Sequence, residues 1–250
     1  MVKLVILGSS CLVATEKQRP THMACLGTEH GLLIDCGVSP RSRLEDLGFD
    51  RDRIGDIFIT HFHPDHAAGL PLFLMELCLR GRHEPVRIHS GAETIRRIRK
   101  IMQLYGWRKL PDQFPVAYHA VKRGKRETIL ENREFRVQST PVRHVVPSLG
   151  VRVEVLAAGK NFVYSADTEP SANLVSLARD TDLLIHEATG AGTGHSSAAQ
   201  AASAARDARA GRLLLIHTNP YTDRNAILAE ARAVFPGDVD IATDKMEINW

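Results

Sequence analysis

His61-Phe62-His63-Pro64-Asp65-His66 places three imidazoles and one carboxylate within six consecutive residues. The preceding residues 56–60 form a short apolar run that predicts a buried strand, and residues 66–75 predict the start of an apolar helix. Metal ligands are commonly held at such a strand-to-helix crossing, because the strand is rigid and the loop spreads the side chains. The spacing H-x-H-x-D-H is typical of a two-metal hydrolase, and the alternative is a polar surface turn.

The composition is that of a globular protein, and we expect a single domain over residues 1–250. Hydrophobic residues make up 44% of the chain, and no apolar run approaches the roughly 20 residues that a membrane-spanning helix needs. The cysteines show no C-x-x-C pairing, so we expect small buried side chains in a reducing cytoplasm, and no disulfide framework. They are Cys11, Cys25, Cys36 and Cys78.

The basic residues gather in two groups, although the formal net charge is only +3. The groups are Arg96, Arg97, Arg99, Lys100, Arg108 and Lys109, and then Lys122, Arg123, Lys125 and Arg126. Such groups are usually solvated faces, and the second interpretation is that they attract an anionic substrate.

Short β-branched runs alternate with helical stretches along the chain. We expect strands at residues 3–7, 32–35, 57–60, 86–89, 135–139, 151–155, 162–165, 183–186 and 213–217, and helices at residues 41–47, 70–79, 93–104, 197–208 and 225–234. This order predicts two sheets packed face to face with helices outside. The strand ends of both halves would then meet along one edge.

Three further candidate ligands follow predicted strands: His144, Asp167 and His217. A single His or Asp at a strand end is more often structural, but three of them beside a complete H-x-H-x-D-H motif indicate one site. The resulting imidazoles and carboxylates suit two divalent cations. We expect one cation on His61, His63 and His144, a second on Asp65, His66 and His217, and Asp167 bridging them. Zinc is the first expectation, and manganese or iron would accept the same ligands.

In the order of these blocks, the chain resembles the metallo-β-lactamase superfamily over nearly all of its length. The matching blocks are Leu33-Ile34-Asp35-Cys36-Gly37, residues 60–66, His144, Ser165-Ala166-Asp167 and His217. The resemblance implies an α/β fold, an αββα four-layer sandwich with the metal site at one edge of the two packed sheets. It also implies that Asp35 organises a loop near the site and is not a ligand.

A finer resemblance is to ribonuclease Z and its phosphodiesterase relatives. It is carried by His186-Glu187-Ala188-Thr189, by residues 194–202, which begin Gly194-His195-Ser196, and by residues 144–150. In that subgroup, the counterpart of His195 faces the scissile phosphate and is held by the counterpart of Glu187. The resemblance also suggests a homodimer.

The same residue types suit phosphodiester hydrolysis, which needs a hydroxide at neutral pH, positive charge at the phosphoryl oxygens and a proton for the departing alkoxide. Two metal ions would supply the first two, and we expect Asp65 to orient the attacking water and take its proton. His195 is the candidate general acid, and Glu187 would fix its tautomer and keep it protonated. The alternative for His195 is an ordinary residue at the start of a helix.

Two departures from the ribonuclease Z pattern bear on the substrate. Only 22 residues separate His144 from Asp167, so the long arm with which many ribonuclease Z enzymes grip transfer RNA is not expected there. After His217 comes Thr218-Asn219-Pro220-Tyr221, where the resemblance would place a phosphate-binding Arg. Residues 104–115 mix aromatics, cations and turn residues, and form either a cover that faces the substrate or an ordinary surface loop.

We therefore expect a phosphodiesterase that acts on an anionic substrate: RNA ends, cyclic nucleotides or other small diesters. The alternative is a hydrolase of thioesters, lactones or other carboxylic esters, because a tetrahedral oxyanion needs the same two-metal support. A non-catalytic metal-binding or partner-binding domain is the least favoured class, since no ligand position is lost.

Overall fold

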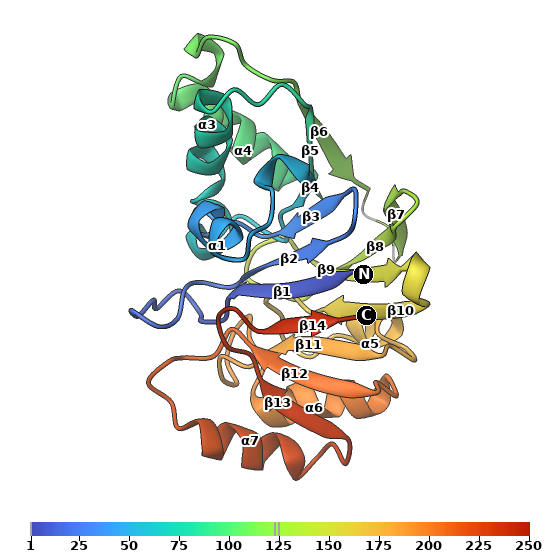
Figure 1. Cartoon of the computed structure of the whole chain (residues 1–250). Coiled ribbons are helices and arrows are strands. Elements are labelled where there is room, and N and C mark those ends of the chain that lie inside the picture. The colour runs from blue at the N-terminus through green and yellow to red at the C-terminus, as the bar shows by residue number, and fades with distance from the viewer. Residues whose placement is uncertain (1, 123, 125) are drawn as a thin grey trace.

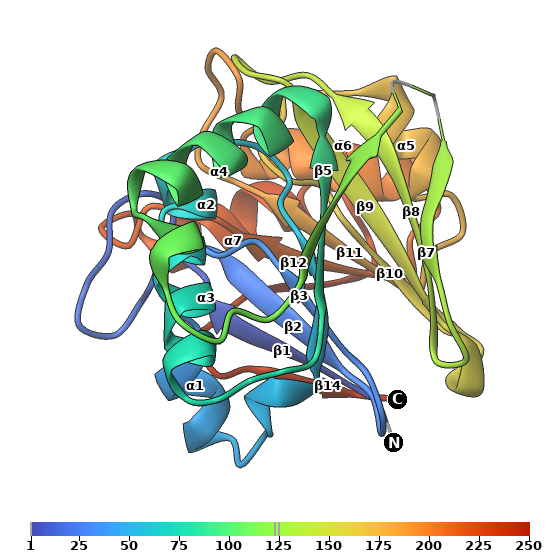
Figure 2. The ribbon, with the colours of Figure 1, turned by 90° about the horizontal axis from the view of Figure 1, so that it is seen from above.

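The computed structural model describes residues 2–122, 124 and 126–250. Arg123 and Lys125 of the second basic group lie outside the described residues. In this part of the chain, the strands form two sheets of seven that pack face to face, and helices cover both outer faces (Figures 1 and 2). The expected αββα sandwich is confirmed.

The first sheet comes from the N-terminal half and the last strand of the chain. Its order is β14-β1-β2-β3-β4-β5-β6, with bounds β1 Lys3–Gly8, β2 His22–Leu26, β3 Gly31–Ile34, β4 Ile54–Phe58, β5 Val86–Gly91, β6 Val116–Val121 and β14 Glu247–Asn249. Strands β3 to β6 run parallel. Strand β14 pairs with β1, so the two termini lie side by side (Figure 1).

The second sheet has the order β13-β12-β11-β10-β9-β8-β7. Its bounds are β7 Glu127–Glu131, β8 Phe135–Val142, β9 Ser148–Val155, β10 Lys160–Tyr164, β11 Leu183–Glu187, β12 Arg212–Ile216 and β13 Asp238–Ile241. Strands β10 to β13 run parallel, so their carboxyl ends point to one edge of the sheet. In open α/β sheets, ligands bind at that edge.

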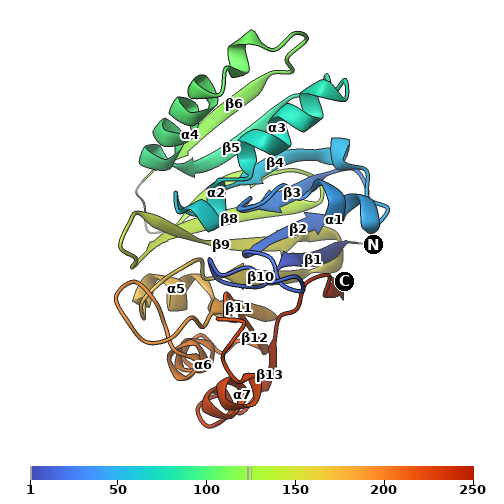
Figure 3. The ribbon, with the colours of Figure 1, turned by 90° about the vertical axis from the view of Figure 1, so that its left-hand side faces the viewer.

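The helices divide between the two outer faces. The first sheet carries α1 Arg41–Asp46, α2 Pro64–Ala67, α3 Leu70–Leu79 and α4 Ala92–Leu104, and the second carries α5 Ala172–Leu177, α6 Ala198–Asp207 and α7 Arg224–Arg232. Short 3₁₀ turns cover η1 Arg51–Arg53, η2 Trp107–Lys109 and η3 Leu156–Ala158. Figure 3 shows α4 and β6 at one end of the molecule, with α7 and β13 at the other.

The alternation of side chains along the strands builds separate apolar layers. In β1, Leu4 and Ile6 point between the two sheets, whereas Val5 and Leu7 point toward the helices of the first sheet. Helix α6 packs on the second sheet through small residues such as Ala201 and Ala205, so it can approach the sheet closely.

The expected strands and helices are all present, with bounds that differ by at most three residues. Seven elements were not predicted: β2, β6, β7, β13, β14, α2 and α5. All four cysteines are buried and free, as expected. Among the described residues, no helix combines the length and the apolar character that crossing a bilayer requires.

Candidate metal centre

The HxHxDH segment connects β4 to the single turn of α2. His63 is the N-cap residue with extended backbone angles, and Pro64 occupies the first helical position, where its missing N–H costs nothing. The loop after β3 lies directly against this turn, because Gly37 has no Cβ and a Cβ there would overlap the backbone of Asp65. Local sequence and close packing together fix the directions of His61, His63, Asp65 and His66.

Three imidazoles meet on one side of the centre. His61 Nε2 lies 3.1 Å from His63 Nδ1, and His144 Nε2 lies 3.1 Å from the same His63 atom. Zn–N bonds of roughly 2.0–2.1 Å in tetrahedral geometry place ligand nitrogens about 3.3 Å apart. The three nitrogens therefore have the spacing of ligands around one metal ion.

A carboxylate and two imidazoles form the second group. His66 Nε2 lies 3.3 Å from His217 Nε2, and Asp65 Oδ2 lies 3.2 Å from His217 Nε2 and 3.6 Å from His66 Nε2. These separations again match donors around one cation. Burial supports this interpretation, because all three side chains are almost inaccessible to solvent.

Asp167 lies between the two groups. Its Oδ1 is 3.5 Å from the Nε2 atoms of His66 and His217, and its Oδ2 is 3.8 Å from His61 Nε2. The Oδ1 atom is buried and has no hydrogen-bond donor among the described residues. Leaving a buried carboxylate oxygen unsatisfied is costly, so this atom fits a position between two cations.

Outer hydrogen bonds fix the orientation of the imidazoles. Nδ1 of His66 donates to Asp35 Oδ2 at 2.8 Å, and Nδ1 of His144 donates to the Gly194 carbonyl at 2.6 Å. His217 Nδ1 lies 2.8 Å from Thr189 Oγ1. Each contact leaves the Nε2 atom free for a metal, which is the usual pattern for metal-binding histidines.

Three residues at the centre other than glycine have a left-handed backbone. Asp35, Ala166 and His217 follow β3, β10 and β12 with left-handed φ angles of 61°, 54° and 57°. Such angles cost about 1 kcal/mol or more for residues other than glycine, and they persist where the surroundings impose them. At Gly194, with φ of 86°, a Cβ would lie 2.8 Å from His144 Nδ1, so glycine is required there.

The protonation states of most of the ligands suit metal binding. His66 is the exception: burial lowers its pKa, but the carboxylates of Asp167 and Asp35 raise it well above the ordinary value, so its proton would leave when a cation binds. Burial lowers the pKa values of His61, His63 and His144, which keeps these imidazoles neutral at pH 7. Burial alone would raise the pKa of Asp65, but the hydrogen bond with His217 and the nearby imidazoles hold it below its ordinary value. Neutral imidazoles and ionised carboxylates are the forms that bind cations.

His195 lies at the mouth of the centre, outside the two groups. Its Nδ1 lies 3.1 Å from Glu187 Oε1, and its ring stacks at 5.9 Å on His217 and meets the edge of His144 at 5.1 Å. The hydrogen bond with Glu187 raises the pKa of His195. Glu187 is buried and also accepts the backbone N–H groups of Thr168, Thr189 and Ser196, so it fixes the loop that carries His195.

The structure thus brings together all of the expected ligands, with Asp65 among them, and places His195 and Glu187 beside them. The sequence did not predict the residues that hydrogen-bond to the ligands and to Asp35. They are Thr60, Thr189 and the carbonyl of Gly194, and all three lie within the matching blocks. Their partners are set by the fold: Thr60 Oγ1 lies within 3.0 Å of the Asp35 carboxylate. Residues 104–115 border a different cavity, whose lining includes none of the expected ligands.

A fold of this kind with clustered His and Asp donors at one sheet edge defines a metal-dependent hydrolase. The family described as Beta-lactamase superfamily domain matches residues 30–218, so the chain belongs to this superfamily. Ribonuclease Z of Methanothermobacter thermautotrophicus is 30% identical, with 99% of this chain and 96% of the relative covered, which places the chain in the ribonuclease Z family.

Two solved structures share the fold. The metallo-β-lactamase fold protein YhfI from Bacillus subtilis has a TM-score of 0.82 at 21% identity, covering 99% of this chain and 98% of its own. The short form of human tRNase Z has a TM-score of 0.81 at 24% identity, with the same coverage. The alignment with the Methanothermobacter protein runs over 303 positions, so that relative has more than 50 positions without a counterpart in this chain.

Proposed function

We propose that this chain, as one domain, is a two-metal phosphodiesterase that cleaves RNA. His61, His63 and His144 would hold one cation, Asp65, His66 and His217 would hold the other, and Asp167 would contribute to both. Zinc is the proposed metal because imidazole and carboxylate ligands at these spacings suit it. We further propose that the enzyme acts in the cytoplasm as a homodimer, in keeping with the family to which it belongs.

The division of roles follows from the chemistry. Bound divalent cations supply a hydroxide at neutral pH and positive charge at the phosphoryl oxygens. Asp65 lies at the cluster and is ionised, so it can orient the attacking water and accept its proton. His195 donates a proton to the departing alkoxide, and Glu187 keeps that imidazole protonated and oriented.

The pair formed by His195 and Glu187 is the observation that carries the proposal. Cations can stabilise the tetrahedral oxyanion of a thioester, and its thiolate leaves without a proton, so a general acid beside the metal ligands disfavours a thioester substrate. A carboxylic ester also releases an alkoxide, so the choice against it rests on the relatives named ribonuclease Z. An alkoxide leaving from phosphorus needs a general acid, and His195 is a cationic donor next to the metal ligands. RNA as the substrate rests on the relatives named ribonuclease Z and ribonuclease BN, which align over nearly the whole chain.

A panel of substrates tests the proposal. Purified, metal-loaded protein is assayed on an RNA precursor with a 3′ extension, a cyclic nucleotide, bis(p-nitrophenyl) phosphate and a thioester. Cleavage of the RNA and of the nitrophenyl diester, with negligible thioester hydrolysis, is the expected result. Preferential hydrolysis of the thioester would overturn the phosphodiesterase assignment.

A further inference from the structure

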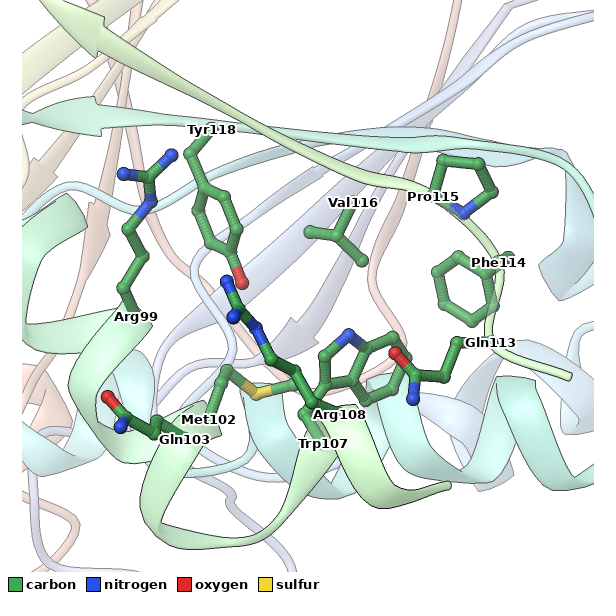
Figure 4. A pocket seen from close by; sticks show the side chains of 10 residues that line it. All are labelled: Arg99, Met102, Gln103, Trp107, Arg108, Gln113, Phe114, Pro115, Val116 and Tyr118. Atoms are coloured by element: carbon green, nitrogen blue, oxygen red, sulfur yellow. The ribbon is translucent and has the colours of Figure 1, made fainter. Parts of the chain in front are cut away.

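A cavity of about 670 Å³ opens between the end of α4, the turn η2 and the edge strand β6 (Figure 4). Its volume lies in the range of small-molecule sites, roughly 300–1,000 Å³. Trp107 and Met102 form its buried floor, and Tyr118 of β6 stands over it. The cavity is large enough for a nucleotide, whereas an isolated ion would leave it mostly unfilled.

Two guanidinium groups face the aromatic wall of this cavity. Arg99 lies over the Tyr118 ring at 4.8 Å, and Figure 4 shows Arg108 reaching across toward the Tyr118 hydroxyl. Within the described part of the chain, neither arginine has a carboxylate partner. Arg97, on the same helix as Arg99, differs because it forms an ion pair with Glu93. Gln103 and Gln113 add amide groups to the rim.

This combination matches the chemistry of single-stranded nucleic acid. Sequence-independent sites for single strands combine cations that contact the phosphates with aromatic rings on which bases stack. Guanidinium groups without acidic partners are available to bind phosphate in bidentate geometry. An acidic peptide would satisfy the two arginines, but it would leave the aromatic wall without a planar partner.

Helix α4 connects the cavity to the metal centre. Close to the middle of α4, Arg97 lies 5.8 Å over the ring of Phe62, the residue between His61 and His63. Phe62 and Arg97 also line a small depression together with Val146, near His144. The 13 residues of α4 span about 20 Å, so this one helix reaches from the neighbourhood of Phe62 to the cavity.

We propose that the cavity beneath Tyr118 is a binding site for a nucleotide of the RNA substrate, with its phosphate on Arg99 and Arg108 and its base against Tyr118. The strand would run along α4 from this site to the metal centre. The site would give this chain a second contact with RNA. Only 22 residues lie between His144 and Asp167, where many ribonuclease Z enzymes carry a long arm that binds transfer RNA. This inference rests on the proposed function, because it takes RNA as the substrate.

The test compares two double variants by RNA binding and by turnover of a small diester. Arg99→Ala with Arg108→Ala removes the two cations of the cavity, and Lys100→Ala with Lys109→Ala removes the same charge from neighbouring positions outside its lining. Binding of a fluorescein-labelled RNA of about 20 nucleotides with phosphorothioate linkages is followed by anisotropy at several salt concentrations. Turnover of bis(p-nitrophenyl) phosphate reports on the metal centre.

The arginine variant should bind RNA about tenfold or more weakly, and the slope of log K against log salt should become shallower by about 0.7, because contact with one phosphate is lost. The lysine variant should change the affinity less than about threefold, because its charges only add to the long-range field. Tyr118→Leu should weaken binding about tenfold through the lost stacking. All three variants should turn over the small diester like the wild type.

Equal losses in the two double variants would show a diffuse basic surface and overturn the site, as would unchanged RNA affinity in the arginine variant. Conversion of a dimer to a monomer by the arginine substitutions would assign the cavity to a subunit contact, which also overturns it. The proposed function can fail separately. If RNA binds through the cavity but the wild-type protein does not cleave unmodified RNA, the binding site is supported and the ribonuclease activity is refuted.

Discussion

Replacing His195 with alanine should slow the hydrolysis of an alkyl diester much more than that of a nitrophenyl diester. The alkoxide needs a proton as it departs, whereas nitrophenolate is a stable anion that leaves without one. A positioned general acid contributes about 10²- to 10⁴-fold, which corresponds to about 2.7–5.5 kcal/mol of activation free energy. We expect a loss in kcat of at least a hundredfold for the alkyl diester, and a loss of a few fold for the nitrophenyl diester.

The structure indicates that this substitution leaves the rest of the site in place. The His195 side chain is 27% exposed, so its removal opens no buried void. Glu187 keeps the backbone N–H groups of Thr168, Thr189 and Ser196 as donors at 2.9–3.2 Å. The matched control is Ser197→Ala, which removes the N-cap of α6 at a cost of about 1 kcal/mol in stability and should leave the ratio of the two rates unchanged.

The pH dependence gives a second readout of the same role. The hydrogen bond with Glu187 raises the pKa of His195, so the acid form persists to higher pH and the rate falls only as pH rises through that raised value. Glu187→Gln should therefore move the alkaline fall of kcat for the alkyl diester to lower pH. Equal losses for both diesters in His195→Ala would refute the general-acid role, and no loss with either would favour the ester or thioester alternative.

Three further outcomes are expected. Purified protein should contain close to two equivalents of transition metal by elemental analysis, and His63→Ala should lose at least one of them together with activity; full metal content and turnover in this variant would refute the ligand set. Asp65→Ala should lower both metal content and rate, whereas His195→Ala should keep the metals, and equal metal loss in the two would show that His195 is misplaced. Glu134→Gln should lower the free energy of unfolding at pH 7 by about 2 kcal/mol, because this carboxylate accepts hydrogen bonds from three consecutive backbone N–H groups that begin at Thr28. Burial opposes ionisation of Glu134, but these hydrogen bonds hold its pKa below the ordinary value. The stabilisation is therefore present above the pKa of the unfolded state and is lost as pH falls through the pKa of the folded state. Denaturant unfolding measures the difference in stability between wild type and variant, and a difference that persisted in acid would contradict this reasoning.

Local sequence predicted the elements whose side chains are buried on both faces, such as β4 and β12, because continuous apolar runs are required there. The missed strands β6 and β7 lie at the edges of the two sheets, and several of their side chains are exposed. Edge strands owe their conformation to one neighbouring strand and carry little pattern of their own. The six residues of α5 are likewise held by the Ser171 N-cap and by packing, since a helix this short is unstable alone.

The candidate ligands could be predicted from the sequence because four of them share one six-residue segment and the other three follow strands. Their supporting partners were less accessible. The bond between His144 and the Gly194 carbonyl joins residues 50 positions apart, and the hydrogen bond between His66 and Asp35 spans 31. Such partners depend on how the sheets pack, which no local pattern encodes.

Residues outside the set of metal ligands must determine which substrate the enzyme selects. Two cations held by His and Asp stabilise oxyanions on carbon and on phosphorus alike, so the ligand set by itself favours neither class. Selectivity must then come from groups that act on the leaving atom and from surfaces that hold the remainder of the substrate. Under the proposed function, His195 would meet the first requirement, because the hydrogen bond with Glu187 raises the pKa of this imidazole. In our proposal, Arg99 of α4 and Arg108 of the following turn η2, which have no carboxylate partner among the described residues, would meet the second beside Tyr118. A change in either feature would redirect the enzyme without altering its metal centre.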